Sequence, residues 1–173
     1  DKSVCPKMAQ LSGIEEGDGV IEIGPGIGVL TVELAKRAQK VVSVELDAGL
    51  LPVLARTLDG KTNVFVEHAD ILETELKAHI KKYFSEGQRI HVCANLPYYI
   101  TSPIIVYLLE SGIKFSSLTL MVQKEAADRI TAKLGQREAG ALTAAVQYRT
   151  VAKKLFDVGS ASFTPPPKVN SSV

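Results

Sequence analysis

The segment from Asn95 to Pro103, Asn-Leu-Pro-Tyr-Tyr-Ile-Thr-Ser-Pro, combines hydrogen-bond acceptors with aromatic rings. The side-chain oxygen of Asn95 and the main-chain carbonyl of Leu96 can each accept a hydrogen from an amino group. Pro97 restricts the backbone before it to an extended form. The ring of Tyr98 offers a face on which a planar base can stack. This combination predicts chemistry on the exocyclic amino nitrogen of a nucleobase.

Such a nitrogen is a poor nucleophile because its lone pair is delocalised into the ring. Two acceptors favour a pyramidal nitrogen and stabilise the positive charge that develops on it. One reaction that suits such a site is transfer of a methyl group from a sulfonium donor to the nitrogen. Because a sulfonium methyl is a good electrophile, positioning of the two reactants supplies much of the rate and no strong general base is required. The alternative interpretation is an ordinary turn, since Asn and Pro are common turn residues and Tyr98 could pack in the interior.

A second motif, Glu-Ile-Gly-Pro-Gly-Ile-Gly from Glu22 to Gly28, lies between an apolar stretch and a helical pattern. Glycines in such a turn let the backbone bend sharply and approach a ligand closely. The dinucleotide pattern GxGxxG would need its third glycine where Val29 stands. The spacing therefore favours the nucleoside cofactor of class I methyltransferases, although a tight turn without a ligand would use the same residues.

Two acidic residues are predicted to end the next two strands. Glu45 comes 21 positions after Gly24, close to the spacing at which a carboxylate binds ribose hydroxyls. Asp70 can accept a hydrogen bond from the adenine amino group of a cofactor, or it can cap a following helix. The predicted cofactor-binding set is completed by Pro25, Gly26, Gly28, Leu46 and Ile71.

Apolar runs alternate with helix-period segments along the chain, which predicts a doubly wound α/β fold with a mostly parallel, seven-stranded sheet. We expect a single domain over residues 1–173. Helices are expected from Val29, around Leu50 to Leu58, over Leu72–Phe84, around Ile104 to Leu109 and from Ala126. Strands are expected at Val20–Ile23, Lys40–Leu46, Val64–Val66, Ile90–Ala94 and Leu118–Val122, followed by a closing pair at Leu142–Val151 and Leu155–Val158.

Composition gives little information on partners. The net charge of +1 is low for a protein that grips nucleic acid by phosphate neutralisation alone. Two basic groups could contact phosphates or be solvated helix faces: Lys124, Arg129, Lys133 and Arg137, and Arg149, Lys153 and Lys154. The two cysteines and three histidines are scattered, so no metal site is expected. No apolar run or basic leader suggests a membrane or secretion, and we expect a cytoplasmic protein.

Two more segments complete a family resemblance: Gln123–Arg129, and Phe-Thr-Pro-Pro-Pro-Lys-Val-Asn-Ser from Phe163 to Ser171. With the two motifs above, the chain resembles the small-subunit rRNA adenine dimethyltransferases over nearly its whole length. The resemblance implies methyl transfer from S-adenosylmethionine to two adjacent adenosines in a hairpin near the 3′ end of small-subunit rRNA, during ribosome assembly. It implies cofactor contacts from Gly24, Glu45, Asp70 and Asn95. Its catalytic residues would be Asn95, Leu96, Pro97 and Tyr98, with Phe163 either stacking on the target base or packing as an ordinary core residue.

Family members also begin with a Gln-Asn-Phe-Leu segment and end in a small helical domain, and neither is present in this sequence. We therefore expect a trimmed monomeric core with weakened cofactor binding and activity. Three alternatives remain. They are a large-subunit rRNA adenine methyltransferase of the macrolide-resistance type, a non-catalytic ribosome-assembly or transcription factor on the same fold, and a nicotinamide oxidoreductase.

Overall fold

The computed structural model describes residues 1–173 and divides them into two compact units. The seven strands follow the order β3-β2-β1-β4-β5-β7-β6, and β5 (Ser117–Gln123) runs from unit 2 into unit 1. Unit 2 comprises Cys5–Asn95 and Lys114–Leu120, and unit 1 comprises Asp1–Val4, Leu96–Ile113 and Met121–Val173.

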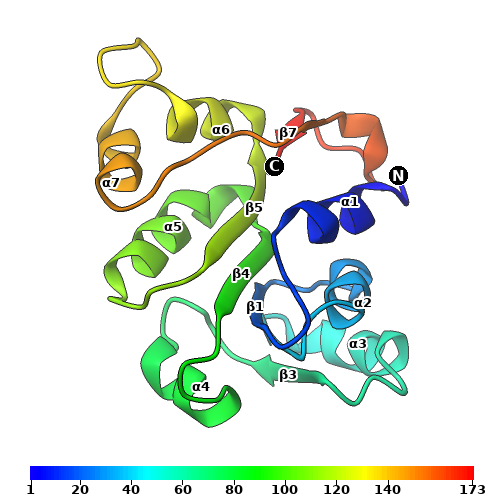
Figure 1. Ribbon diagram of the computed structural model, residues 1–173. Coiled ribbons are helices and arrows are strands. Elements are labelled where there is room, and N and C mark those ends of the chain that lie inside the picture. Colours follow the sequence, from blue (N-terminus) through cyan, green and yellow to red (C-terminus); the bar gives the residue numbers. More distant parts are fainter. The chain divides into compact units, whose positions relative to one another are not determined.

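Unit 2 is built on parallel strands (Figure 1). Every residue of β1 is buried, and so is every residue of β2 after the first. Both strands are covered on two faces, which explains why valine and isoleucine dominate them without polar alternation. The strands are β1 (Gly19–Ile23), β2 (Lys40–Glu45), β3 (Val64–His68) and β4 (Ile90–Asn95).

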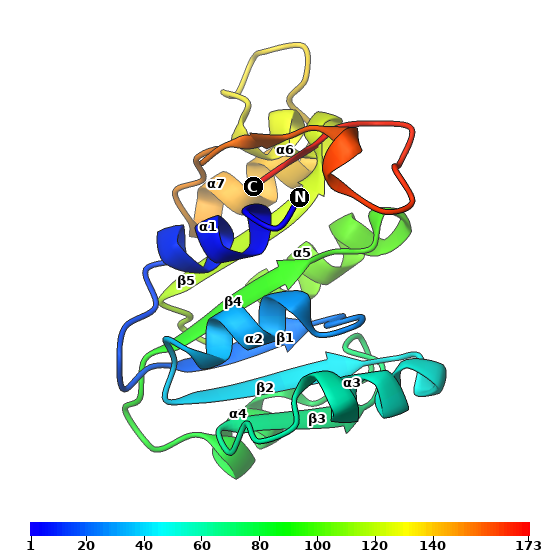
Figure 2. The same cartoon turned by 90° about the vertical axis from the view of Figure 1, so that its right-hand side faces the viewer.

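Helices cover both faces of this part of the sheet. In Figures 1 and 2, α2 and α3 lie on one face of the unit 2 strands and α4 lies on the opposite face. Leu30 and Leu34 of α2 and Leu54 of α3 are buried, as their helical spacing predicts. The helices are α1 (Val4–Leu11), α2 (Val29–Ala35), α3 (Leu51–Thr57) and α4 (Leu76–Tyr83), with a short 3-10 turn η1 (Ala48–Leu50) before α3.

Unit 1 contains three helices and the antiparallel end of the sheet. Helix α7 contacts both α5 and α6, and β7 pairs with β5 and with β6. The helices are α5 (Thr101–Glu110), α6 (Lys124–Thr131) and α7 (Ala141–Arg149); the strands are β6 (Asp157–Val158) and β7 (Ser171–Ser172); the 3-10 turns are η2 (Tyr98–Ile100) and η3 (Ser160–Ser162).

The strand predicted at Leu142–Val151 is wrong, because this segment forms helix α7. Thr143 and Val146 are buried at a spacing of three, while Tyr148 and Val151 are exposed, so the apolar residues mark one helical stripe rather than a strand. Of Leu155–Val158, only Asp157–Val158 is a strand. Strand β3 ends at His68, so Asp70 lies two residues beyond it rather than at its end.

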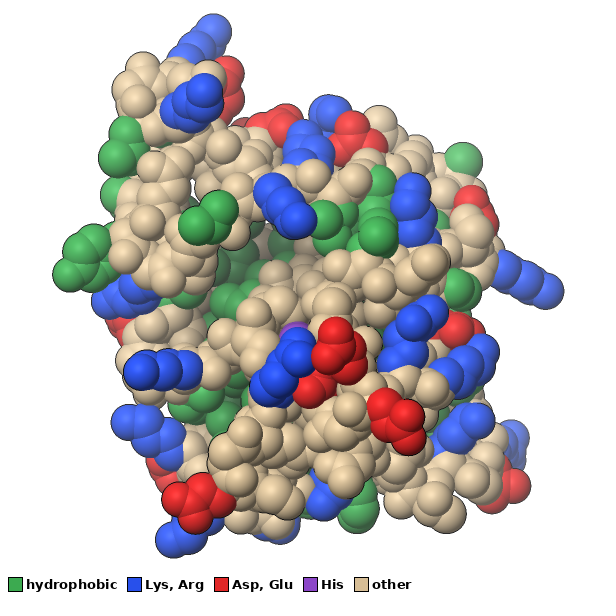
Figure 3. Space-filling model, in the orientation of Figure 1, with side chains coloured by type: hydrophobic (Ala, Val, Ile, Leu, Met, Phe, Trp, Pro, Cys, Tyr) green, Lys and Arg blue, Asp and Glu red, His purple; other side chains and the backbone are tan.

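The predicted α/β class with a seven-stranded, mostly parallel sheet is confirmed. None of the helices combines the length and apolar composition needed to cross a bilayer. Lys and Arg side chains are scattered among Asp and Glu over the face in Figure 3. This face therefore shows no large area of a single charge.

Candidate active site

The register of the parallel strands brings the predicted cofactor residues to one edge of unit 2. Ile23 of β1 pairs with Val44 of β2 and with Ala94 of β4. The residues that follow this row are Gly24, Glu45 and Asn95. Because parallel strands end at the same edge, three residues up to 71 positions apart in the sequence become neighbours at the carboxyl end of the sheet, where open α/β sheets bind ligands.

The turn after β1 requires glycine for conformation and leaves space beside it. Gly24 and Gly26 adopt φ angles of +64° and +60°, in the left-handed region that side chains disfavour. A Cβ at either position would meet no atom within 4 Å. At Gly28, by contrast, a Cβ would approach Leu54 Cδ2 to 3.2 Å. The first two glycines thus border open space that a ligand could occupy, and the third permits close packing against α3.

The carboxylate of Glu45 holds this turn in place. Its Oε2 accepts a hydrogen bond from the Gly26 backbone N–H at 3.1 Å, and its Oε1 accepts one from the Asp47 N–H at 2.8 Å. The residue is buried. Each carboxylate oxygen can accept a second hydrogen bond, so Glu45 can fix the glycine turn and still bind the hydroxyls of a ribose.

Asp70 is held by the turn that it starts. Its Oδ1 accepts a hydrogen bond from the Leu72 N–H at 2.9 Å, and its Oδ2 has no partner in the protein. It does not cap α4, whose N-cap is Glu75. Of the other predicted cofactor residues, Leu46 exposes its side chain just after β2, whereas Ile71 and Pro25 are buried.

The predicted catalytic segment begins at this edge. Asn95 is exposed, and no hydrogen bond within the protein engages its carboxamide. Leu96 is fixed, because its side chain is fully buried and its N–H donates to the Met121 carbonyl at 3.0 Å. Its own carbonyl accepts no hydrogen bond from the protein, and Pro97 is extended with ψ at 132°. Both predicted acceptors therefore remain available to a ligand.

Within unit 1, the Tyr98 hydroxyl is 2.8 Å from Ser171 Oγ in β7, and this hydrogen bond fixes the direction of a half-buried ring. Phe163, directly after η3, is also half-buried, and no ring-to-ring contact joins it to Tyr98. The role of Phe163 in stacking remains a prediction. The sequence did not single out Ser171 as the partner of Tyr98, because their separation of 73 positions gives no local signal.

Glu22, at the start of the glycine motif, was not predicted to be unusual. Its side chain is fully buried, its Oε2 accepts a hydrogen bond from Ser43 Oγ at 2.6 Å, and its Oε1 has no hydrogen-bond partner. Burial raises the pKa of this carboxyl to about 7. A titratable group with a near-neutral pKa therefore lies directly behind the cofactor turn.

Another hydrogen-bonded chain lies away from this edge, at the opposite end of β4. His91 Nε2 is 3.0 Å from Asp18 Oδ2, and His91 Nδ1 is 2.7 Å from Ser117 Oγ. The Ser117 hydroxyl donates to the Ser12 carbonyl, and burial lowers the pKa of His91. Because the serine hydroxyl is engaged with the backbone, this Asp-His-Ser chain stabilises the fold rather than presenting a nucleophile.

Comparison with known proteins decides the family. The family described as "Ribosomal RNA adenine dimethylase" matches residues 1–173, the whole chain. The chain belongs to this family. The small-subunit methyltransferase A of Shouchella clausii (strain KSM-K16), "Ribosomal RNA small subunit methyltransferase A", is 49% identical over 173 residues, which cover 100% of this chain and 58% of that protein. The chain thus spans less than two thirds of the length of this curated relative.

Two solved structures share the fold closely. A dimethyladenosine transferase from Plasmodium falciparum is 32% identical with a TM-score of 0.83, over 99% of this chain and 60% of that one. The 23S rRNA methyltransferase ErmE is 30% identical with a TM-score of 0.82, over 99% of this chain and 66% of that one. The resemblance recognised from the motifs is confirmed. Because the chain belongs to this family, the alternative of a nicotinamide oxidoreductase is wrong.

The residues at the sheet edge fit a nucleoside cofactor such as S-adenosylmethionine. The space beside Gly24 and Gly26 is what a Cβ would fill, and Glu45, Asp70 and Asn95 all keep oxygen lone pairs that the protein does not use. No group of three or more His, Cys, Asp or Glu side chains is arranged to hold a metal ion. This edge of unit 2 can therefore bind sugar hydroxyls and an amino group, and its Asn95 carboxamide remains free to accept a hydrogen bond.

Proposed function

We propose that this chain is the methyl-transferring core of a small-subunit rRNA adenine dimethyltransferase. It uses S-adenosylmethionine to methylate the N6 atoms of two adjacent adenosines in a hairpin near the 3′ end of the rRNA, during ribosome assembly in the cytoplasm. The observation that carries this proposal is the pairing of Ile23 with Ala94, which puts Asn95 directly beside the glycine turn.

Each site residue then has a defined task. Glu45 binds the ribose hydroxyls of the cofactor while it holds Gly26, and the free Oδ2 of Asp70 accepts from the cofactor's adenine amino group. Leu46 gives an exposed apolar surface next to that adenine. S-adenosylmethionine, when bound, supplies an electrophilic methyl group on a sulfonium.

Asn95 and Leu96 act on the target base. The Asn95 side-chain oxygen and the Leu96 carbonyl accept the two amino hydrogens of adenine, which localises the nitrogen lone pair and aims it away from both acceptors. As the N6–methyl bond forms, the methyl–sulfur bond breaks and the neutral thioether S-adenosylhomocysteine is the leaving group. Positive charge passes from sulfur to N6, and the same two oxygens stabilise it there. The surplus proton then leaves N6 for solvent. Tyr98, held by Ser171, and Phe163 stack on the flipped base.

Mass spectrometry of rRNA after incubation with full-length protein and cofactor tests the proposal. Small-subunit particles should gain N6-dimethyl groups on two adjacent adenosines, and large-subunit rRNA should gain none. Methylation of large-subunit rRNA alone would support the alternative of a large-subunit rRNA adenine methyltransferase of the macrolide-resistance type. If calorimetry detects no heat with S-adenosylmethionine, the chain is instead a non-catalytic factor on this fold.

A further inference from the structure

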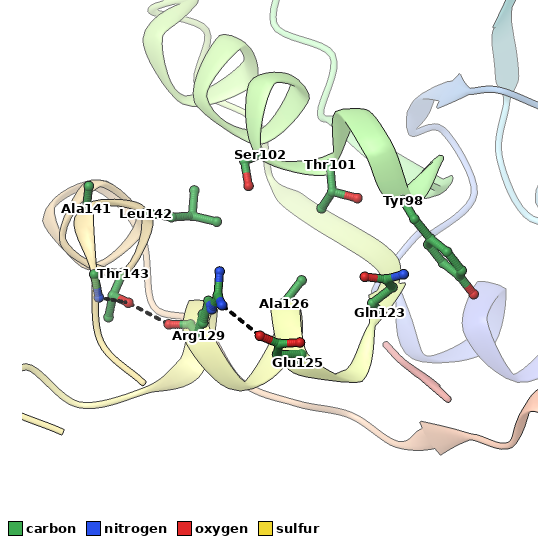
Figure 4. A pocket seen from close by; sticks show the side chains of 11 residues that line it. Tyr98, Thr101, Ser102, Gln123, Glu125, Ala126, Arg129, Ala141, Leu142 and Thr143 are labelled. Carbon is green, nitrogen blue, oxygen red and sulfur yellow. Dashed lines mark hydrogen bonds and ion pairs between the residues drawn. The ribbon is translucent and has the colours of Figure 1, made fainter. Parts of the chain in front are cut away.

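A cavity of about 280 Å³ lies within unit 1, next to the predicted catalytic tyrosine. Tyr98 and Gln123 stand at one end of it, and the first turn of α7 forms the other end (Figure 4). Helices α5 and α6 also begin at its wall. A volume near the lower limit of small-molecule sites suits a single nucleotide rather than a protein segment.

The cavity wall combines apolar and polar groups in the way that a nucleotide requires. Leu142, Ala126 and Ala141 provide an apolar surface, and Leu142 points toward the space between the helices in Figure 4. The Gln123 carboxamide and the Ser102 hydroxyl line the cavity and have no hydrogen-bond partner in the protein. A carboxamide can donate to N7 and accept from N6 of adenine at the same time, so Gln123 matches the edge of an adenine base.

Hydrogen bonds between residues of α6 and α7 hold the cavity wall in place. Thr143 Oγ1 accepts a hydrogen bond from the Gly140 N–H at 3.0 Å and donates one to the Arg129 carbonyl at 2.6 Å. These bonds join the start of α7 to the end of α6. The start of α7 and the end of α6 are therefore fixed to each other at the wall of the cavity.

Arg129 supplies a positive charge that is held only weakly. Its Nη2 lies 2.6 Å from Glu125 Oε1 one helical turn earlier, and both side chains are exposed. Figure 4 shows this ion pair among the residues that line the cavity. Exposed ion pairs of this kind contribute little stability, whereas a guanidinium binds phosphate in a bidentate manner. An incoming phosphate can therefore replace the carboxylate.

We propose that this cavity holds the nucleotide next to the adenosine that is being methylated. Its base lies against Leu142, Gln123 reads its adenine edge, and Arg129 contacts its phosphate. The assignment of this nucleotide as a neighbour rests on the proposed function, in which two adjacent adenosines react. Because Tyr98 borders the cavity, an adenosine stacked on Tyr98 leaves its chain neighbour within reach of this second subsite.

The test is an NMR titration of the full-length protein with the dinucleotide adenylyl-(3′→5′)-adenosine, following the methyl signals of Leu142, Ala126 and Ala141. These signals should shift in a saturable way. Arg129→Ala should weaken binding about tenfold, as expected for the loss of a hydrogen bond to a charged group. Glu125→Gln should strengthen binding a few-fold, because it releases Arg129 and removes a like charge from the phosphate. A merely structural role for either residue would not give these opposite signs.

Two further variants complete the test. Gln123→Glu, of nearly the same shape, should weaken binding because a carboxylate cannot donate to adenine N7. Arg137→Ala, an exposed arginine outside the cavity wall, is the matched control and should leave affinity unchanged. Unshifted methyl signals, or an equal loss in the Arg137 control, would overturn the subsite.

The rRNA methylation assay separates the two proposals. Dimethylation of small-subunit rRNA without dinucleotide binding in the cavity would leave the enzyme assignment standing and remove the subsite. Saturable, Arg129-dependent shifts without methylation would leave a nucleotide site and remove the enzyme assignment.

Discussion

At the scale of single residues, the central feature is a pair of hydrogen-bond acceptors that the protein leaves unused. The Asn95 carboxamide is exposed at the end of β4, while the buried side chain and bonded N–H of Leu96 fix the next peptide. One acceptor is thus on a side chain and the other on a rigid backbone. A rigid acceptor costs no reorganisation when charge develops on the substrate nitrogen.

Replacing Asn95 with alanine in the full-length protein should lower turnover by about two orders of magnitude or more, because one of two charge-stabilising acceptors is lost. Cofactor affinity should fall much less, since Glu45 and Asp70 remain. Single-turnover methyl transfer and calorimetry with S-adenosylmethionine measure the two quantities separately. Turnover close to that of the unchanged protein, at an unchanged melting temperature, would refute the role given to Asn95.

At the scale of elements, the glycine turn couples a strand end to a cofactor surface. Gly26→Ala places a methyl group in the open space beside the turn and forces a left-handed φ on alanine, which costs about 1–2 kcal/mol. We expect a modest drop in melting temperature and a much larger loss of cofactor affinity.

Gly17→Ala is the matched control, because Gly17 also has a positive φ of 98° and open space around its Cβ position, but lies outside the cofactor turn. It should lose stability without losing affinity. Equal losses of affinity in both variants would show that strain, and not contact with the cofactor, explains the effect of Gly26→Ala.

Glu22 in strand β1 makes the free energy of unfolding depend on pH. Its folded-state pKa of about 7 lies above the value of 4.5 expected when unfolded. As pH rises from 4.5 to 7, the unfolded chain releases this proton first, so the free energy of unfolding falls across that window and stays lower above it. A protonated Glu22 is therefore stabilising at low pH, and its contribution is lost as pH rises.

Glu22→Gln keeps a neutral side chain that can still accept from Ser43, and so should remove this pH dependence. Relative to the unchanged protein, the variant should gain stability by about 3 kcal/mol at most between pH 4.5 and pH 8. Urea unfolding of both proteins at the two pH values measures the gain, and other titrating groups cancel in the comparison. A stability difference that is the same at both pH values would contradict the raised pKa.

Elements with a strong local pattern could be predicted, and elements that depend on distant partners could not. The buried valine and isoleucine runs of β1, β2 and β4 and the stripe of α2 are encoded by neighbouring residues. Helix α7 was mistaken for a strand because alanine, valine and tyrosine fit either pattern over a short stretch. Strands β6 and β7 have two residues each and exist only through pairing with each other and with β5.

The same division holds for the candidate site. Gly24, Glu45 and Asn95 could be grouped from sequence because each lies at the end of a recognisable strand, and parallel strands end at a common edge. The cavity beside Tyr98 could not, because its walls come from three helix starts, one of them in the segment predicted as a strand. A short exposed ion pair such as that of Arg129 also has no distinct sequence pattern.

At the scale of the whole molecule, fewer basic residues are free to contact RNA phosphates than their number suggests. Lys124 lies 3.0 Å from Asp157, and Lys154 lies 2.5 Å from Asp128, so acidic neighbours offset both charges. Lys153 and Arg149 are exposed, and the Arg149 guanidinium lies 5.5 Å from the ring centre of Tyr148, which is 85% exposed. An exposed aromatic ring beside basic residues is typical of surfaces that bind single-stranded nucleic acid.

The contrast between ion-paired Lys124 and the exposed, unpaired Arg149 and Lys153 predicts which basic residues contact RNA phosphates. Each phosphate contact releases counterions, so removing one contacting residue reduces the slope of log K against log salt by about 1. Arg149→Ala and Lys153→Ala should each do so for a small-subunit rRNA hairpin. Lys124→Ala should leave the slope unchanged because its partner Asp157, unlike Glu125, is itself held by a hydrogen bond from Ser172 Oγ at 2.6 Å. Filter binding at several salt concentrations measures the slopes. A reduced slope in Lys124→Ala with unchanged slopes in the other two would place the RNA on α6 rather than beyond the end of α7.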